Sequence, residues 1–280
     1  IGGLMQATSA KPKAFIVRTL ASGALRDNGG YYQSPSSTAN SESVIAVERL
    51  ALGDVVVAGT TEMPGSGGTV RQTFFATRFG KSLSTRKWSY RYTLPSTSTK
   101  NYTVKEACIG KVILSGSVAE TEVLVLTGSM YDNAAPATKR SFASCINLSD
   151  GSVLWTTIAN SGLASDEGLD IVQNPISREF LVVGYAVDAD AAKTKRMWVC
   201  KFGPGGDFRG GGVYMLTEAN GLNMVARDVC LSHNGNRFVA TGYREILNPD
   251  GTKRLETFIL EMAPDAPFSP AWAKWYEKSD

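Results

Sequence analysis

The sequence holds few of the residues from which most metal sites and catalytic centres are built. Its 280 residues include one histidine, His233, and four cysteines that form no CxxC pair and lack the spacing of metal ligands. A zinc site or a histidine-based catalytic triad therefore has little to draw on. His233 lies in Ser-His-Asn-Gly-Asn at 232–236, where the Asn-Gly step is typical of a surface turn. We expect neither a metal nor a cofactor.

Strong net charge and long apolar runs are also missing. The net charge is only +3 and the cationic residues are scattered along the chain, so we expect no nucleic-acid partner. No apolar run approaches the roughly 18 residues of a membrane-spanning helix, and we expect no membrane span. An apolar content of 43% with 20% charged residues is typical of a folded protein. No signal peptide is visible and the chain begins at Ile1, which favours a processed product or a fragment.

What the sequence does contain is an internal repeat. FLVVGY at 180–185 returns as FVATGY at 238–243, and looser copies occur at 55–60 and 123–129. The repeat glycines, about 60 residues apart, are Gly59, Gly128, Gly184 and Gly242. Short β-branched and aromatic runs between turn residues, without helical periodicity, predict one four-stranded sheet per repeat. Each repeat glycine either lets two backbones approach closely or is a simple turn glycine.

The strands that follow each glycine complete the predicted architecture. A third strand is followed by a turn and a fourth strand that carries an aromatic residue: Trp88, Trp155, Tyr214 or Trp272. Consecutive strands with short connections favour antiparallel meanders, and meanders repeated radially make a β-propeller. We therefore predict an all-β chain, a single β-propeller domain over 1–280. Its four-stranded antiparallel blades lie at about 1–33, 42–93, 104–158, 168–217 and 226–277. The chain forms either five blades or part of a larger propeller.

Two stretches carry a family resemblance. The third and fourth repeats, with LVVGY at 181–185 followed by WVCKF at 198–202, resemble the tandem β-propeller repeats of extracellular and surface proteins. The stretch NLSDGSVLW at 147–155 is similar to the Asp-Gly-x-x-Leu-Trp turn of quinoprotein-like propeller blades. In such blades the tryptophan docks one sheet against the next, which implies a packing role for the four fourth-strand aromatics. Tyr214 departs from the tryptophan of that pattern.

Two asparagines are candidates for glycosylation. Asn101-Tyr-Thr lies in a Ser/Thr-rich connector, and Asn147-Leu-Ser lies in the turn after a third strand. Short sequons also arise by chance, about once or twice in a chain of this length. If the protein is secreted from a eukaryote, we expect Asn101 to be used first.

The cysteines are expected to be free thiols that pack as small hydrophobic residues. Cys145 and Cys200 lie in third strands of adjacent repeats, and Cys108 and Cys230 lie in first strands. A first and a third strand of one sheet are about 9–10 Å apart, which is too far for a disulfide. The best disulfide alternative is a bridge between Cys200 and Cys230 of adjacent blades.

Acidic residues recur in the first strands, and these are the nearest approach to a catalytic set. A sugar hydrolase needs two carboxylates that face one another, and Glu106, Asp170 and Asp228 occupy similar first-strand positions. Recurrence in several repeats favours structural capping of the strands over an active site, which is made once.

Together these observations predict a non-catalytic extracellular or cell-surface propeller. It would present variable, glycosylated loops to protein partners or to further copies of itself, in a filament or a surface assembly. The alternatives are a carbohydrate-active or quinoprotein-like propeller enzyme that uses the central channel, and a glycan-binding lectin with the same pocket in each repeat.

Overall fold

The computed structural model describes residues 2–5, 13–16, 30–31, 41–65, 68–83, 85–92, 98–114, 116–190, 192–214, 222–233, 237–263 and 270–277. These residues form strands and turns without an α-helix, so the predicted all-β fold class is confirmed. Accordingly, the described residues include no helix with the length and apolarity of a membrane span.

The strands form five antiparallel sheets, which we number in chain order. Sheet 1 contains β1 (Gly2–Met5), β2 (Lys13–Ile16) and β3 (Gly30–Tyr31). Sheet 2 contains β4 (Glu42–Arg49), β5 (Val55–Pro64), β6 (Val70–Phe79) and β7 (Arg86–Arg91). Sheet 3 contains β8 (Lys100–Ile113), β9 (Glu120–Asp132), β10 (Ala135–Asn147) and β11 (Val153–Ile158). Sheet 4 contains β12 (Ser165–Gln173), β13 (Phe180–Val187), β14 (Lys195–Phe202) and β15 (Phe208–Tyr214). Sheet 5 contains β16 (Met224–Leu231), β17 (Phe238–Leu247), β18 (Lys253–Met262) and β19 (Pro270–Glu277).

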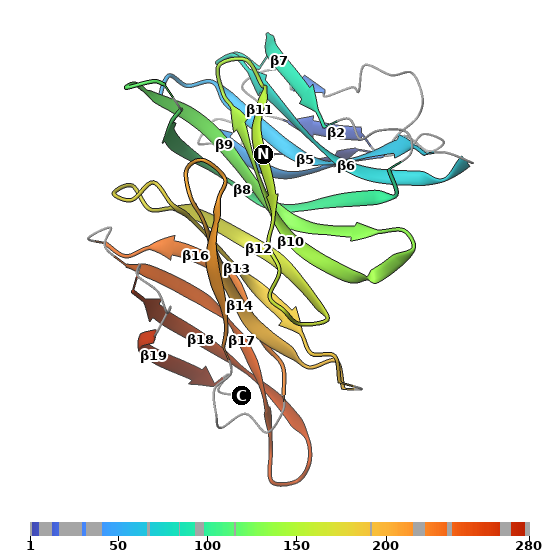
Figure 1. Cartoon of the computed structure of the whole chain (residues 1–280), viewed down its shortest axis with the longest axis vertical. Coiled ribbons are helices and arrows are strands. Elements are labelled where there is room, and N and C mark those ends of the chain that lie inside the picture. The colour runs from blue at the N-terminus through green and yellow to red at the C-terminus, as the bar shows by residue number, and fades with distance from the viewer. Residues whose placement is uncertain are drawn as a thin grey trace, which may run out of the picture.

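The sheets follow one another in a propeller-like arc (Figure 1). Each of sheets 2–5 is a meander in which neighbours along the chain are neighbours in the sheet. The first strands β4, β8, β12 and β16 contact one another in succession, so they form the inner side of the arc. Sheets 1 and 2 lie at one end of the long axis and sheet 5 lies at the other (Figure 1), and the described strands do not close into a ring.

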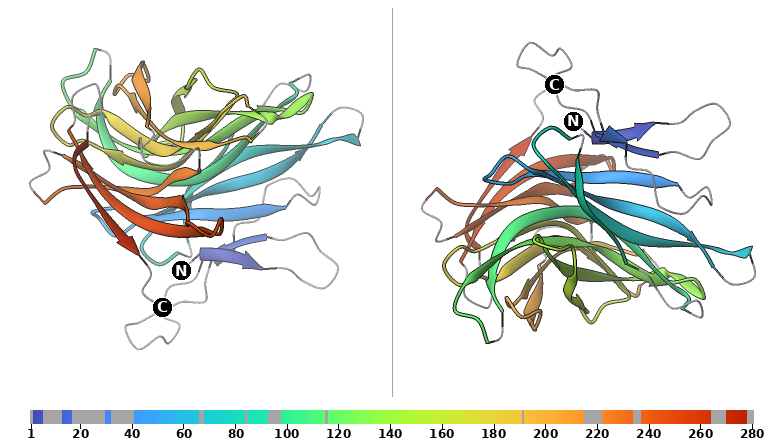
Figure 2. Two further views of the ribbon diagram at one scale, coloured as in Figure 1. Left: turned by 90° about the horizontal axis from the view of Figure 1, so that it is seen from below. Right: turned by 90° about the horizontal axis from the view of Figure 1, so that it is seen from above.

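Hydrophobic cores fill the gaps between sheets 2 and 3, sheets 3 and 4, and sheets 4 and 5. Figure 2 shows these sheets from below and from above. Side chains alternate between the two faces of a strand, and β13 shows the consequence. Phe180 and Val182 pack in the core shared with sheet 3, whereas Leu181 and Val183 pack in the core shared with sheet 5. We call the face of a sheet that is turned toward the next sheet its forward face.

The repeat glycines allow a close backbone approach. Each pairs with the first strand just before a β-bulge, and β12 shows the shift between Gly168 and Asp170. A Cβ atom on Gly184 would lie 2.0 Å from the Glu167 carbonyl oxygen, and one on Gly242 would lie 2.0 Å from the Val225 oxygen. None of the four glycines has a positive φ. Close approach, rather than a turn, therefore explains why glycine recurs there.

Candidate functional site

Two of the fourth-strand tryptophans dock one sheet onto the next. The Trp88 indole nitrogen donates to the Leu148 carbonyl at 2.9 Å, and its ring lies against Gly151 of sheet 3. The Trp155 indole nitrogen donates to the Pro204 carbonyl at 3.1 Å, and its ring lies against Gly206 of sheet 4. In both cases the indole covers the turn between the third and fourth strands of the following sheet.

Tyr214 occupies a different position from these tryptophans. In the strand register Tyr214 pairs with Met197, whereas Gly210 lies where Trp88 and Trp155 lie in their sheets. Gly210 has a positive φ of 101°, which disfavours a side chain there, and a Cβ atom on the neighbouring Gly211 would lie only 2.4 Å from the Trp198 ring. Tyr214 instead packs against the core between sheets 4 and 5. Tyr214 therefore lies at a different register position from the two tryptophans, although it too packs at the boundary with the following sheet.

Trp272 pairs with Glu261 in the register that the docking position requires. Its side chain lies outside the described residues, so its docking role stays a prediction.

The two sequons lie in different environments. Asn101 lies within β8 and is 1% exposed. Its amide nitrogen donates to the Thr99 carbonyl and to Asn133, and its oxygen accepts from the Gln72 backbone. A glycan on that nitrogen is incompatible with this packing, which contradicts the expectation that Asn101 is used first. Asn147 is half-buried at the end of β10, and glycosylation there stays a prediction.

All four cysteines are free in the structure. Cys145 and Cys200 are buried in the core between sheets 3 and 4, where burial raises their pKa values. Cys230 is exposed on β16, so the alternative of a Cys200–Cys230 disulfide is not supported. Cys230 also departs from the expectation of burial.

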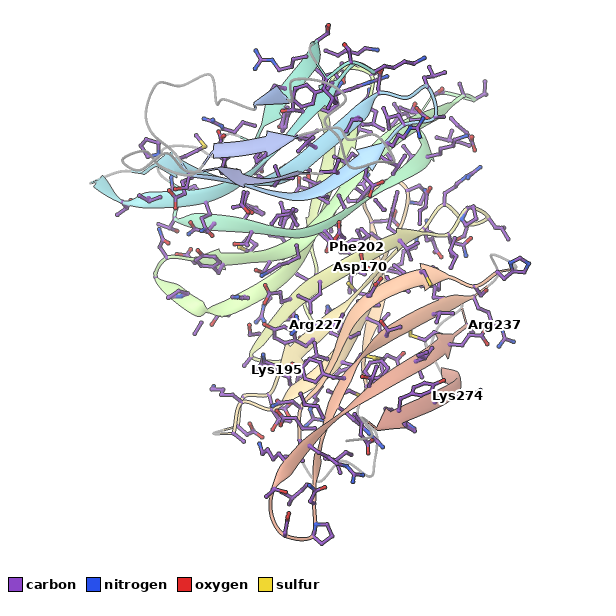
Figure 3. All side chains as sticks on the ribbon, turned by 180° about the vertical axis from the view of Figure 1, so that it is seen from behind. Asp170, Lys195, Phe202, Arg227, Arg237 and Lys274 are labelled. Atoms are coloured by element: carbon purple, nitrogen blue, oxygen red, sulfur yellow. The ribbon has the colours of Figure 1, made fainter. Side chains whose placement is uncertain are left out.

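Two of the first-strand carboxylates, those of Asp170 and Glu106, accept hydrogen bonds from backbone amides. The Asp170 carboxylate accepts the Val229 amide of sheet 5 at 2.6 Å and the Ile171 amide at 2.7 Å. Figure 3 shows Asp170 near the middle of the arc. Burial, together with a hydrogen bond to the Asp228 carboxyl group, raises the pKa of Asp170 to about 7. Glu106 accepts the Ala107 amide at 3.0 Å, and burial raises its pKa as well.

A pKa near neutrality is found in general acids and bases, but also in structural carboxyl groups. Both Asp170 oxygens are already occupied by backbone donors, and one of these donors belongs to the next sheet. The described residues include no group of three or more His, Cys, Asp or Glu side chains that could hold a metal ion. The arrangement therefore favours strand capping across the boundary between sheets 4 and 5.

A second carboxylate fills the boundary between sheets 3 and 4. Glu167 is 3% exposed and lies directly before the β12 bulge. It pairs with Lys105 and Lys139 of sheet 3, each at 3.3 Å. Ser129 donates to it at 3.2 Å and Tyr185 at 2.6 Å. Sequence reasoning missed this group, because its neighbours are assembled from separate strands.

The equivalent place between sheets 2 and 3 is a pocket with a volume of about 290 Å³. Gly184 lies against the Glu167 carbonyl and Gly128 lies against the Thr103 carbonyl, so Thr103 is the equivalent of Glu167. Its shorter side chain leaves the space open. The pocket is lined by Ser41, Glu42, Ser43, Ile45, Thr60, Glu62, Gln72, Thr103, Val104 and Lys105.

The forward face of sheet 5 has no covering sheet in the described part of the chain. In sheet 4 the forward residues Leu181, Val183, Met197 and Val199 are all 0% exposed. Their equivalents in sheet 5 are Val239, Thr241, Thr257 and Ile259, none of which is buried. Cys230 pairs with Val239 and lies on the same face. Lys274 pairs with Ile259, and Figure 3 shows it on β19.

Comparison with known proteins adds little to this description. No family model matches the chain, and no curated protein matches it. A solved structure described as "Crystal structure of the eukaryotic initiation factor" aligns with 95% of this chain and 75% of that chain, at 7% sequence identity. The TM-score of 0.35 is too low to support a conclusion about the fold or the function of this chain.

Proposed function

We propose that this chain is a non-catalytic structural module of propeller repeats, extracellular or at a cell surface, that assembles with further copies of itself. The observation that carries the proposal is the uncovered forward face of sheet 5. The connecting loops and the Asn147 sequon would then face partners or carry glycans. Because the recurrent carboxylates Asp170 and Glu106 hold backbone amides, they support a structural role over a catalytic one.

The occupant that we propose for the uncovered face is a β-sheet of a second copy. Inside the chain, the forward faces of sheets 2, 3 and 4 are each covered by the sheet of the following repeat. The forward face of sheet 5 is the next in this series, and a sheet of a second copy can cover it as sheets 3, 4 and 5 cover the forward faces within the chain. Its apolar members Val239, Tyr243 and Ile259 lie beside Thr241 and Glu261, a mixture typical of non-obligate interfaces.

A lysine on this face should weaken the assembly. We expect the wild-type chain to form dimers or larger species as its concentration rises in sedimentation velocity. Replacing Ile259 by lysine places a second positive charge opposite Lys274 on the face, and the dissociation constant should rise about tenfold or more. Ile176→Lys is the matched control, because Ile176 is 72% exposed in a turn of sheet 4 and should leave assembly unchanged.

A wild-type chain that stays monomeric at every concentration would contradict the proposal. So would an assembly that responds equally to Ile259→Lys and Ile176→Lys. Circular dichroism of both variants separates a loss of assembly from a loss of folding.

A further inference from the structure

We propose that the pocket between sheets 2 and 3 binds a neutral, hydroxyl-rich ligand of monosaccharide size. This inference is independent of self-assembly, because it concerns the opposite half of the arc from sheet 5. It begins from the contrast between two equivalent boundaries of the same chain. Glu167 fills one of them with a carboxylate that receives four side-chain donors. Thr103 leaves the other open.

The residues around the pocket also differ from those around Glu167. Lys105 is the extra residue of the β8 bulge, and its equivalent at the β4 bulge is Ile45. Lys139 lies three residues before Phe142, and its equivalent before Phe75 is Gln72. The two cations that hold Glu167 are thus replaced by an apolar and an amide side chain. The open boundary is therefore not a copy of the filled one that has merely lost its carboxylate.

The polar groups of the pocket include both donors and acceptors. The Gln72 side-chain oxygen accepts from Thr103 at 3.0 Å and from Tyr131 at 3.3 Å. Its amide nitrogen has no hydrogen bond among the described residues and can donate to a ligand. Glu62 accepts the Ser41 backbone amide through one oxygen, and its other oxygen can accept from a ligand. A hydroxyl group both donates and accepts hydrogen bonds, so a polyol can bond to the Gln72 amide nitrogen and to the Glu62 oxygen.

The charges of the pocket disfavour an ionic ligand. Lys105 extends from sheet 3 and pairs with Glu167 at 3.3 Å, while Glu62 lies on the sheet 2 side together with Glu42, which pairs with Arg91 at 3.9 Å. An anion would meet Glu62 and a cation would meet Lys105, so a neutral ligand avoids both repulsions. Ile45, which is 37% exposed, offers an apolar surface to the carbon face of a sugar ring.

The size of the pocket limits the ligand further. Small-molecule pockets generally measure about 300–1,000 Å³, and this one, at about 290 Å³, lies at the lower end. A single sugar unit fits that volume, either as a free monosaccharide or as the terminal unit of a glycan. This pocket differs from the lectin alternative with the same pocket in each repeat, because it depends on Thr103, Ile45 and Gln72, which the boundary between sheets 3 and 4 does not repeat.

The test is saturation-transfer NMR of the full chain with the methyl glycosides of glucose, galactose, mannose and N-acetylglucosamine. We expect at least one of them to bind with millimolar affinity. An oligosaccharide that ends in the same sugar distinguishes the two sources, because tighter binding of the oligosaccharide identifies a glycan chain and equal binding identifies the free sugar.

Two variants assign the binding to this pocket. Thr103→Gln places an uncharged side chain of glutamate length at the equivalent of Glu167, and we expect binding to be lost. Thr138→Gln, at an exposed position of β10, is the matched control and should bind as wild type does. Glu62→Gln keeps the size but removes the charged acceptor, and binding should weaken about fivefold or more.

The proposal is overturned if no methyl glycoside shows saturation transfer, or if binding survives in Thr103→Gln. Equal binding by wild type and Glu62→Gln would also contradict the proposed site, because Glu62 would then not accept a hydrogen bond from the ligand. Circular dichroism shows whether Thr103→Gln folds, and Glu62→Gln keeps the test decisive if it does not. None of these results depends on the oligomeric state, so a failure here leaves the assembly proposal standing.

Discussion

Alanine in place of Gly184 is expected to destabilise the fold by about 3 kcal/mol or more, at the upper end of the cost of overpacking. The new Cβ atom would lie 2.0 Å from the Glu167 carbonyl oxygen, which is fixed backbone and cannot rotate away. The chain must then separate β12 from β13 at the bulge. Because Glu167 adjoins the bulge, its contacts with Lys105 and Lys139 across the boundary should weaken too. Urea unfolding at equilibrium measures the difference.

The control for this change is Gly80→Ala. A Cβ atom on Gly80 has its nearest neighbour at 3.6 Å and the residue has no positive φ, so the cost should stay below about 1 kcal/mol. If Gly184→Ala costs no more than Gly80→Ala, close approach at the bulge does not explain why glycine recurs at this position.

The second large effect is a loss of stability with rising pH, caused by Asp170 and Asp228. Burial and the hydrogen bond to Asp228 raise the pKa of Asp170 to about 7 in the folded chain, against about 3.9 in an unfolded one. Protonated Asp170 is thus favoured by folding. Its contribution is complete below about pH 3.9 and is lost as the pH rises through about 7. Because a tenfold change in proton affinity corresponds to about 1.4 kcal/mol, the free energy of unfolding should fall by several kcal/mol over this range.

Asp228→Asn should reduce this dependence without abolishing it, because the burial that contributes most to the raised pKa of Asp170 remains. The substitution removes the neighbouring carboxyl group but leaves the hydrogen bonds that the Ile171 and Val229 amides donate to Asp170. We expect the variant to be more stable than wild type at pH 8 and nearly equal at pH 4, by urea unfolding. Asp190→Asn, at an exposed loop position, should follow wild type at both pH values. A variant that is less stable than wild type at pH 8 would rule out repulsion between these two carboxyl groups.

The features that the sequence predicted well are those encoded by neighbouring residues. The period of about 60 residues is set by runs such as 180–185 and 238–243, and each run lies in the second strand of its sheet. The Asp-Gly turn at 150–151 is likewise encoded by adjacent residues, and the Trp88 ring lies against it. The all-β fold follows from these local patterns.

What the sequence could not predict depends on strand register. Tyr214 resembles Trp155 in its place along the repeat, but the register of β15 shifts around the glycines at 210–212. Asn101 was placed in a connector, because nothing nearby shows that β8 begins at Lys100. The pocket depends on the equivalence of Thr103 and Glu167, which becomes visible only when both are aligned on their bulges.

Cys230 offers the most direct measurement of the central claim, that a second copy covers the forward face of sheet 5. It is exposed on that face, whereas Cys145 and Cys200 are buried, so a thiol reagent should distinguish them. The account predicts that Cys230 reacts rapidly in dilute wild-type protein and that its rate constant falls as the protein concentration rises into the range of assembly. A rate constant that stays the same in dilute and in assembled protein would contradict it.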